Sequence, residues 1–112
     1  MYFKSEGAFD KTHILYPDWK EKINFSPEGP RPQVLEEDNR LKVILAGLEP
    51  GQKIPEHPEN LGMYYFLEGK GWMIVDGERI EVSQGATVIT PQGAVRGMEA
   101  QSRLAFIAAR VA

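Results

Sequence analysis

The feature that most constrains the fold is a series of short apolar segments from Leu41 onward, each ended by glycine or proline. No part of this region repeats its apolar residues with the 3.6-residue period of a helix. Asp76-Gly77 is a strong two-residue hairpin signal. Many short strands separated by turn signals predict an all-β sandwich or closed barrel. The predicted strands span residues 41–48, 63–67, 72–75, 79–83, 86–90 and 104–111.

The first 40 residues differ, because they hold half of the eight prolines and show little regular alternation. Asp18 is placed to cap one helical turn over residues 19–21, with Glu21 at the third helical position. Trp19, Ile23 and Phe25 make this segment too apolar for a free tail. We therefore expect residues 1–40 to form an irregular arm packed on the barrel or on a partner subunit, and residues 41–112 to form the barrel.

Composition narrows the function classes. A chain of 112 residues with a net charge of −3 fits one compact domain and argues against nucleic acid, which needs a basic surface. The absence of cysteine excludes disulfides, thiolate nucleophiles and cysteine-ligated zinc. No apolar run approaches the roughly 20 residues that span a bilayer, and residues 1–7 do not form an apolar export signal. We expect a cytoplasmic protein with no membrane or nucleic-acid partner.

Two spaced motifs carry a resemblance to a known family. The first runs from Gly51 through His57-Pro58-Glu59 to Gly69, and the second runs from Gly85 through Pro91-Gln92-Gly93 to Arg96. Both resemble the motifs of the cupin superfamily, Gly-X5-His-X-His-X3,4-Glu-X6-Gly and Gly-X5-Pro-X-Gly-X2-His. The resemblance covers about two thirds of the chain and implies a small single-domain cupin, a double-stranded β-helix or jelly-roll barrel.

The resemblance also implies a place for one divalent metal, bound by three histidines and a glutamate. Position by position, this chain keeps His57, has Glu59 at the second histidine, and has Gly62 or Met63 at the glutamate. The last histidine is replaced by Arg96, a permanent cation that cannot ligate a metal. His57 and Glu59 are therefore the credible metal ligands, and we expect no tightly held metal or other cofactor.

Arg96 admits three interpretations. If it points into the barrel as the family histidine does, it requires a partner, and an Arg96–Glu59 pair, with His57 nearby, would replace the metal centre. In a second version Arg96 binds a ligand carboxylate or phosphate bidentately. In the third it faces solvent at the barrel mouth. The other candidate ligand-binding residues are Tyr64, Phe66 and Met98, of which we expect the two aromatic ones to point inward by analogy with the family.

Three functions remain open. The preferred one is a barrel that binds a small apolar or anionic molecule without a tightly held metal. The alternatives are a metal-dependent isomerase, oxygenase or lyase using His57 and Glu59, and a structural or oligomerisation barrel whose cavity is filled by aromatic and methionine side chains. Whether the chain is an enzyme stays open. The strand Leu104–Val111 is apolar on both faces, which predicts a homodimer.

Overall fold

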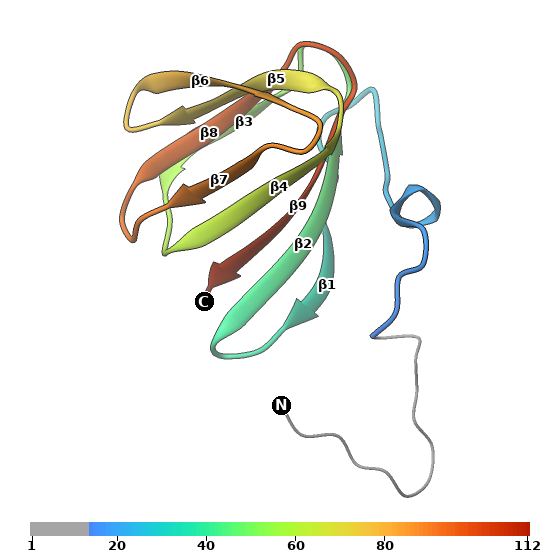
Figure 1. Ribbon diagram of the computed structural model, residues 1–112, viewed down its shortest axis with the longest axis horizontal. Helices are drawn as coiled ribbons and strands as arrows, with labels where there is room; N and C mark the ends of the chain where they lie inside the picture. Colours follow the sequence, from blue (N-terminus) through green and yellow to red (C-terminus); the bar gives the residue numbers. More distant parts are fainter. Residues whose placement is uncertain (1–13) are drawn as a thin grey trace, which may run out of the picture.

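The computed structural model describes residues 14–112 and contains two antiparallel β-sheets and no α-helix within that range. One sheet has the strand order β1-β2-β9-β4-β7 and the other has the order β3-β8-β5-β6 (Figure 1). This arrangement confirms the predicted all-β cupin barrel, with an irregular segment before β1. The strands are β1 (Gln33–Glu37), β2 (Leu41–Leu48), β3 (Lys53–Pro58), β4 (Gly62–Glu68), β5 (Lys70–Val75), β6 (Glu78–Ser83), β7 (Thr87–Thr90), β8 (Val95–Ala100) and β9 (Leu104–Val111).

The segment before β1 lies along the outside of the strands (Figure 1). It contains one 3-10 turn, η2 (Trp19–Glu21), whose N-cap Asp18 accepts a hydrogen bond from the Lys20 backbone N–H, as the sequence predicts. Phe25 lies against β2, where a Cβ added at Gly47 would be 2.7 Å from its ring. Because β1 pairs with β2, the sheet begins before the boundary expected at residue 41.

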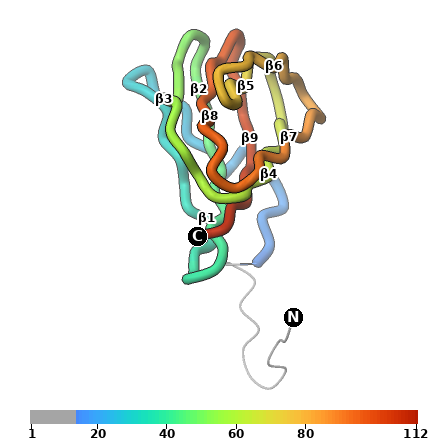
Figure 2. Tube along the Cα trace, turned by 90° about the vertical axis from the view of Figure 1, so that its left-hand side faces the viewer, coloured from blue at the N-terminus to red at the C-terminus, as the bar shows by residue number. Residues whose placement is uncertain are grey.

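Three strands were not among those predicted: β1, β3 and β8. β3 contains Pro55 and Pro58, which lower its strand signal, but proline is tolerated on edge strands because the missing N–H faces away from the ladder. β3 is such an edge strand, paired only with β8 in its sheet, as Figure 2 shows.

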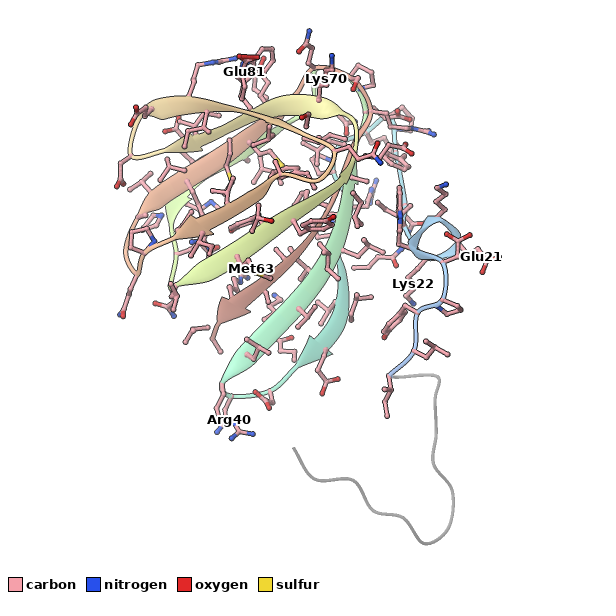
Figure 3. All side chains as sticks on the ribbon, in the orientation of Figure 1. Glu21, Lys22, Arg40, Met63, Lys70 and Glu81 are labelled. Carbon is pink, nitrogen blue, oxygen red and sulfur yellow. The ribbon has the colours of Figure 1, made fainter. Side chains whose placement is uncertain are left out.

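The interior of the barrel is closed at one end and hollow at the other. Leu48, Phe66 and Leu104 are completely buried and belong to the hydrophobic core cluster that fills the closed end. This is the end that carries Lys70 and Glu81, whereas Arg40 marks the opposite end, at the tip of the β1–β2 hairpin (Figure 3). Residues of the two strands that this hairpin joins, Val34 on β1 and Lys42 on β2, line a cavity. The fold thus places its cavity at the Arg40 end.

The outer face of the larger sheet carries exposed apolar side chains near the same end. Leu41, Met63, Ile89 and Val111 lie there on four strands, and Ile89 is 67% exposed. An apolar outer face is what the expected homodimer would use, and the dimer stays a prediction. Among residues 14–112, no helix has the length and apolar character needed to cross a bilayer.

Candidate functional site

The cavity at the Arg40 end has a volume of about 370 Å³, within the range of small-molecule sites although near its lower limit. Strand pairing arranges its wall in layers. At the mouth, Lys42 pairs with Arg110 and Arg110 pairs with Gly62, while His57 pairs with Arg96 in the other sheet. The lining residues are Pro32, Val34, Lys42, Ile44, Ile54, His57, Glu59, Tyr64, Met73, Arg96, Gly97, Met98, Phe106 and Arg110.

Arg96 points inward and is almost completely buried, with a side chain only 3% exposed. Its Nη1 donates hydrogen bonds to the Asn60 backbone oxygen at 2.9 Å and to Thr90 Oγ1 at 2.8 Å. Its Nη2 lies 3.6 Å from Glu59 Oε1, an ion-pair distance that is too long for a hydrogen bond. The structure therefore rules out the interpretation in which Arg96 faces solvent.

The guanidinium of Arg96 is nonetheless incompletely partnered. Its Nε and Nη2 are buried and have no hydrogen-bond partner among residues 14–112. The face of its guanidinium lies 5.1 Å from the ring centroid of Tyr64, a cation–π contact. A buried donor left without a partner costs about 1–3 kcal/mol, so this edge of Arg96 is the most unsatisfied part of the site.

Glu59 links the cationic groups of the mouth. Its backbone is fixed by hydrogen bonds with the turn after β7, where its N–H donates to the Ala94 oxygen and its oxygen accepts from the Gly93 N–H. Its carboxylate, 17% exposed, accepts hydrogen bonds from Arg110 Nη1 and lies 2.5 Å from His57 Nε2. One carboxylate thus offsets parts of three basic side chains.

His57 is oriented from both ring nitrogens. Its Nδ1 lies 2.9 Å from the Pro55 backbone oxygen, which can only accept, so Nδ1 carries the hydrogen in this arrangement. Its Nε2 lies within hydrogen-bond distance of Glu59 Oε2. The ring is therefore held against the mouth by its neighbours, and it is 47% exposed.

Below this polar mouth the wall is apolar. Ile54 pairs with Met98 and Met98 pairs with Met73 across one sheet, and Ile44 and Phe106 line the cavity from the other. Tyr64 lies between the two layers, and burial raises the pKa of its hydroxyl, an effect that the charge of Arg96 opposes. The site is therefore amphipathic, with charge at the mouth and hydrocarbon beneath it.

The structure brings together five of the six side chains proposed from the sequence. His57, Glu59, Tyr64, Arg96 and Met98 all line the cavity, and Tyr64 and Phe66 both point inward. Phe66 belongs to the packed core and is not part of the cavity wall. The alternative of a structural barrel would fill the cavity with Tyr64, Phe66, Met63 and Trp72. Met63 is instead 43% exposed, and Trp72 stacks with Arg79 and is not part of the cavity lining.

Sequence reasoning missed Arg110. Its signal is visible in retrospect, because it is the one charged residue in β9, whose sequence is otherwise apolar. Leu104, Phe106 and Ala108 are buried at alternate positions, and the period of two in a strand puts Arg110 on the same inward face. A charge that continues a buried alternation is therefore a sign of a polar site.

These residues do not fit the metal centre that the family can hold. No group of three or more His, Cys, Asp or Glu side chains within residues 14–112 is placed to hold a metal ion. His57 and Glu59 already contact each other, and two guanidinium groups approach the same carboxylate. A Cβ added at Gly62 would lie 3.4 Å from Arg96 Nη2, so the guanidinium lies beside one of the two positions that match the family glutamate, Gly62 or Met63. The other histidine, His13, lies outside the described residues.

Comparison with solved structures finds the same fold in several bacterial proteins. A conserved protein of unknown function from Streptococcus pyogenes (SPY1581) is 21% identical, with 88% of each chain covered and a TM-score of 0.80. An RmlC-like cupin from Desulfovibrio desulfuricans is 21% identical, with 92% of this chain and 97% of that chain covered and a TM-score of 0.76. A predicted oxalate decarboxylase from Thermotoga maritima is 20% identical, with 73% and 79% covered and a TM-score of 0.67.

At these identities the structural likeness establishes the fold and no activity. No protein with a curated description matches the chain. The model of the cupin domain family matches residues 44–109, more than half of the chain and all of β3 to β8. The chain belongs to the cupin family.

Proposed function

We propose that this cupin binds a small anionic organic molecule in its barrel and holds no metal tightly. The observation that carries the proposal is Arg96, whose guanidinium lies in the wall of a cavity of about 370 Å³ with two buried nitrogen atoms unpartnered. Native proteins pair nearly all buried polar groups. An anion that enters the cavity would supply the missing partner.

The charge of the lining supports the same proposal. Lys42, Arg96 and Arg110 are cationic and Glu59 is the one carboxylate, so the wall has an excess of positive charge without counting His57. The whole chain, in contrast, has a net charge of −3. A cleft lined by one sign of charge raises the local concentration of ligands of the opposite sign.

A metal-dependent enzyme is the alternative, in which His57 and Glu59 would be the ligands. One similar structure bears the name of a predicted oxalate decarboxylase, which keeps this class open. A divalent cation would, however, have to take Glu59 away from Arg96 and Arg110 and then lie beside both guanidinium groups. Repulsion between like charges a few ångströms apart opposes that arrangement.

Two measurements on the purified protein test the proposal. Elemental analysis after incubation with iron, manganese, nickel and zinc is expected to find no stoichiometric metal. Calorimetric titration with carboxylates, phosphate monoesters, sulfonates and oxalate is expected to find at least one class that binds at one site per chain.

Matched arginine variants locate the binding. Saturable binding is expected to be lost in Arg96→Gln and kept in Arg103→Gln, which removes an arginine from the outer surface. Stoichiometric metal that disappears in His57→Ala would favour the enzyme instead, and binding of no anion from the panel would leave the proposal without support.

A further inference from the structure

The hydrogen-bond donors of Arg96 specify the shape of the missing partner. Nη1 uses both of its hydrogens, one on the Asn60 oxygen and one on Thr90 Oγ1. The two atoms left over are Nε and Nη2, which form one edge of the planar guanidinium. Two parallel N–H groups along one edge match the two oxygens of a carboxylate, which gives a bidentate pair.

A second arginine of this molecule uses the equivalent edge of its guanidinium to bind a carboxylate. On the outer surface, Arg103 donates from Nε to Glu49 Oε1 and from Nη2 to Glu49 Oε2, both at 3.1 Å. Arg96 presents the equivalent pair of nitrogens inside the barrel, but neither makes a hydrogen bond to a carboxylate, since Glu59 Oε1 approaches Nη2 only to 3.6 Å. The Arg103–Glu49 pair is therefore an internal example of the contact that the cavity lacks.

The rest of the mouth limits how many acidic groups can be bound. Arg110 and His57 already contact Glu59, and Lys42 lies 4.0 Å from Glu37. Among the described lining residues, Arg96 is the one whose nitrogen atoms are buried without a hydrogen-bond partner. One ligand carboxylate would satisfy the Nε–H and Nη2–H groups of Arg96. A second carboxylate would lie close to Glu59 or in the apolar layer, where a buried charge is costly.

The apolar layer determines the remainder of the ligand. Ile44, Ile54, Met73, Met98 and Phe106 form this part of the wall, and two of the five are methionines, which adapt to irregular shapes. The cavity volume of about 370 Å³ holds about a dozen heavy atoms at about 30 Å³ for each water-sized group. Because the cations lie at the mouth, the hydrocarbon end of a ligand would enter first.

From these observations we infer that the ligand is a monocarboxylic acid with an apolar body of up to about a dozen heavy atoms, held side-on by the Nε–Nη2 edge of Arg96. The carboxylate lies at the mouth and the body lies between Met73, Met98 and Phe106. The inference rests on the proposed function, and it adds the acidic group, its geometry and the orientation of the ligand.

Four ligands, three of which share a phenethyl body, test the inference without changing the protein. The probes are 3-phenylpropionate, its uncharged amide 3-phenylpropanamide, phenethyl phosphate and the dicarboxylate glutarate, each titrated by calorimetry. We expect 3-phenylpropionate to bind at one site and at least tenfold more tightly than each of the other three. The amide lacks the charge that strengthens the hydrogen bonds, the phosphate lacks the planar pair of oxygens, and glutarate would place a second carboxylate in the apolar layer.

The outcomes separate the inference from the proposed function. Tighter binding of the phosphate or of glutarate would overturn the monocarboxylate and leave an anion-binding cupin. Equal binding of the acid and its amide, or binding of none of the probes, would overturn both.

Variants then assign the contact to Arg96. Arg96→Lys keeps the charge but offers no planar edge, so we expect at least a tenfold loss of affinity for 3-phenylpropionate. Arg103→Lys breaks the same kind of edge on the outer surface and is expected to leave the affinity unchanged. Equal affinity of the wild type and a folded Arg96→Lys protein would overturn the side-on contact. If Arg96→Lys fails to fold, the comparison of the acid with its amide still decides the inference.

Discussion

Glu59→Gln tests how the cationic mouth of the cavity is held together in the absence of ligand. The substitution keeps the size of the side chain and one oxygen acceptor but removes the negative charge that Arg96, Arg110 and His57 share. Arg96 has a side chain only 3% exposed, so it cannot recover its lost partner from solvent. We therefore expect Glu59→Gln to lower the stability of the fold substantially, although it changes only one group near the surface.

The magnitude follows from the geometry. Glu59 Oε1 lies 3.6 Å from Arg96 Nη2, and two unit charges about 4 Å apart near a protein surface interact by roughly 4 kcal/mol. Breaking a buried ion pair by removing one partner costs about 3–5 kcal/mol. Glu59 is 17% exposed, which reduces the effect. We expect the free energy of unfolding to fall by about 3 kcal/mol, at the lower end of that range.

Urea and thermal unfolding, followed by circular dichroism, measure the effect. In a domain of this size 1 kcal/mol shifts the melting temperature by roughly 4–8 °C, so a fall of about 12–24 °C is expected. The matched control is Glu56→Gln on β3, because Glu56 is exposed and makes no ion pair in the described structure. A surface substitution of that kind changes stability by about 0.5 kcal/mol or less.

The comparison of the two variants decides the reasoning. If Glu59→Gln is no less stable than Glu56→Gln, then Glu59 does not offset the cations of the mouth and the electrostatic account of the site is wrong. A loss of stability that appears equally in both variants would point to β3 and the residue that follows it, and not to the ion pairs of Glu59.

Three other perturbations probe the scaffold. Gly69→Ala would place a Cβ 1.9 Å from the Arg103 backbone oxygen at a φ of +92°, whereas Gly85 has a φ of +90° and nothing within 4 Å of an added Cβ. Thermal melts should show a loss of stability of about 1–2 kcal/mol for Gly85→Ala, from the left-handed conformation alone, and a clearly larger loss for Gly69→Ala. Equal losses would refute the clash with Arg103. The hydrogen bond from Arg103 lowers the pKa of Glu49, so this pair stabilises the fold fully above the ordinary glutamate pKa, and the contribution is lost as the pH falls below that value and through the lowered pKa of the folded state. Acid unfolding of Glu49→Gln should lack this component, and superimposable wild-type and variant profiles would contradict it. Ile89→Asp on the outer apolar face should weaken the proposed homodimer in sedimentation, and a wild-type chain that stays monomeric at all concentrations would refute the dimer.

The sequence predicts the barrel because its signals there are local. The expected glycines at turns, Gly51, Gly69, Gly85 and Gly93, all have positive φ values. β2 and β9 match the predicted ranges, and the Asp76-Gly77 hairpin joins β5 to β6. Turn chemistry and alternation depend on a few neighbouring residues, which is why one sequence is enough for them.

The strands that the sequence missed depend on their position in the sheet. β3 reads as a poor strand because of Pro55 and Pro58, and only its place at the sheet edge, beside β8, makes those prolines acceptable. The apolar sequence pattern of β8 is interrupted by Arg96 and Gly97, although the strand itself is continuous. Glu56 and the Ile54 backbone oxygen pack closely over Gly97, with 2.8 Å to an added Cβ. Neither fact can be read from the segment alone.

The candidate site divides in the same way. The motif spacing located His57, Glu59 and Arg96 at one mouth because the family register fixes those positions. Arg110 lies 51 residues from Glu59 in the sequence, and the pairing of β9 with β4 brings it opposite Gly62, three residues after Glu59. The unpartnered edge of Arg96 is also invisible in the sequence, since it depends on which nitrogen atoms Asn60 and Thr90 already occupy.

The proposal that Arg96 binds a carboxylate depends on its Nε–H group, which nitrogen-15 NMR observes directly. The signal is assigned by its loss in Arg96→Lys, and Arg103 Nε–H, already bound to Glu49, serves as the internal reference. On titration with 3-phenylpropionate, the account predicts that Arg96 Nε–H shifts saturably, with the same midpoint as the calorimetric titration, while Arg103 Nε–H stays in place. A ligand that binds without moving the Arg96 Nε–H signal would contradict the account.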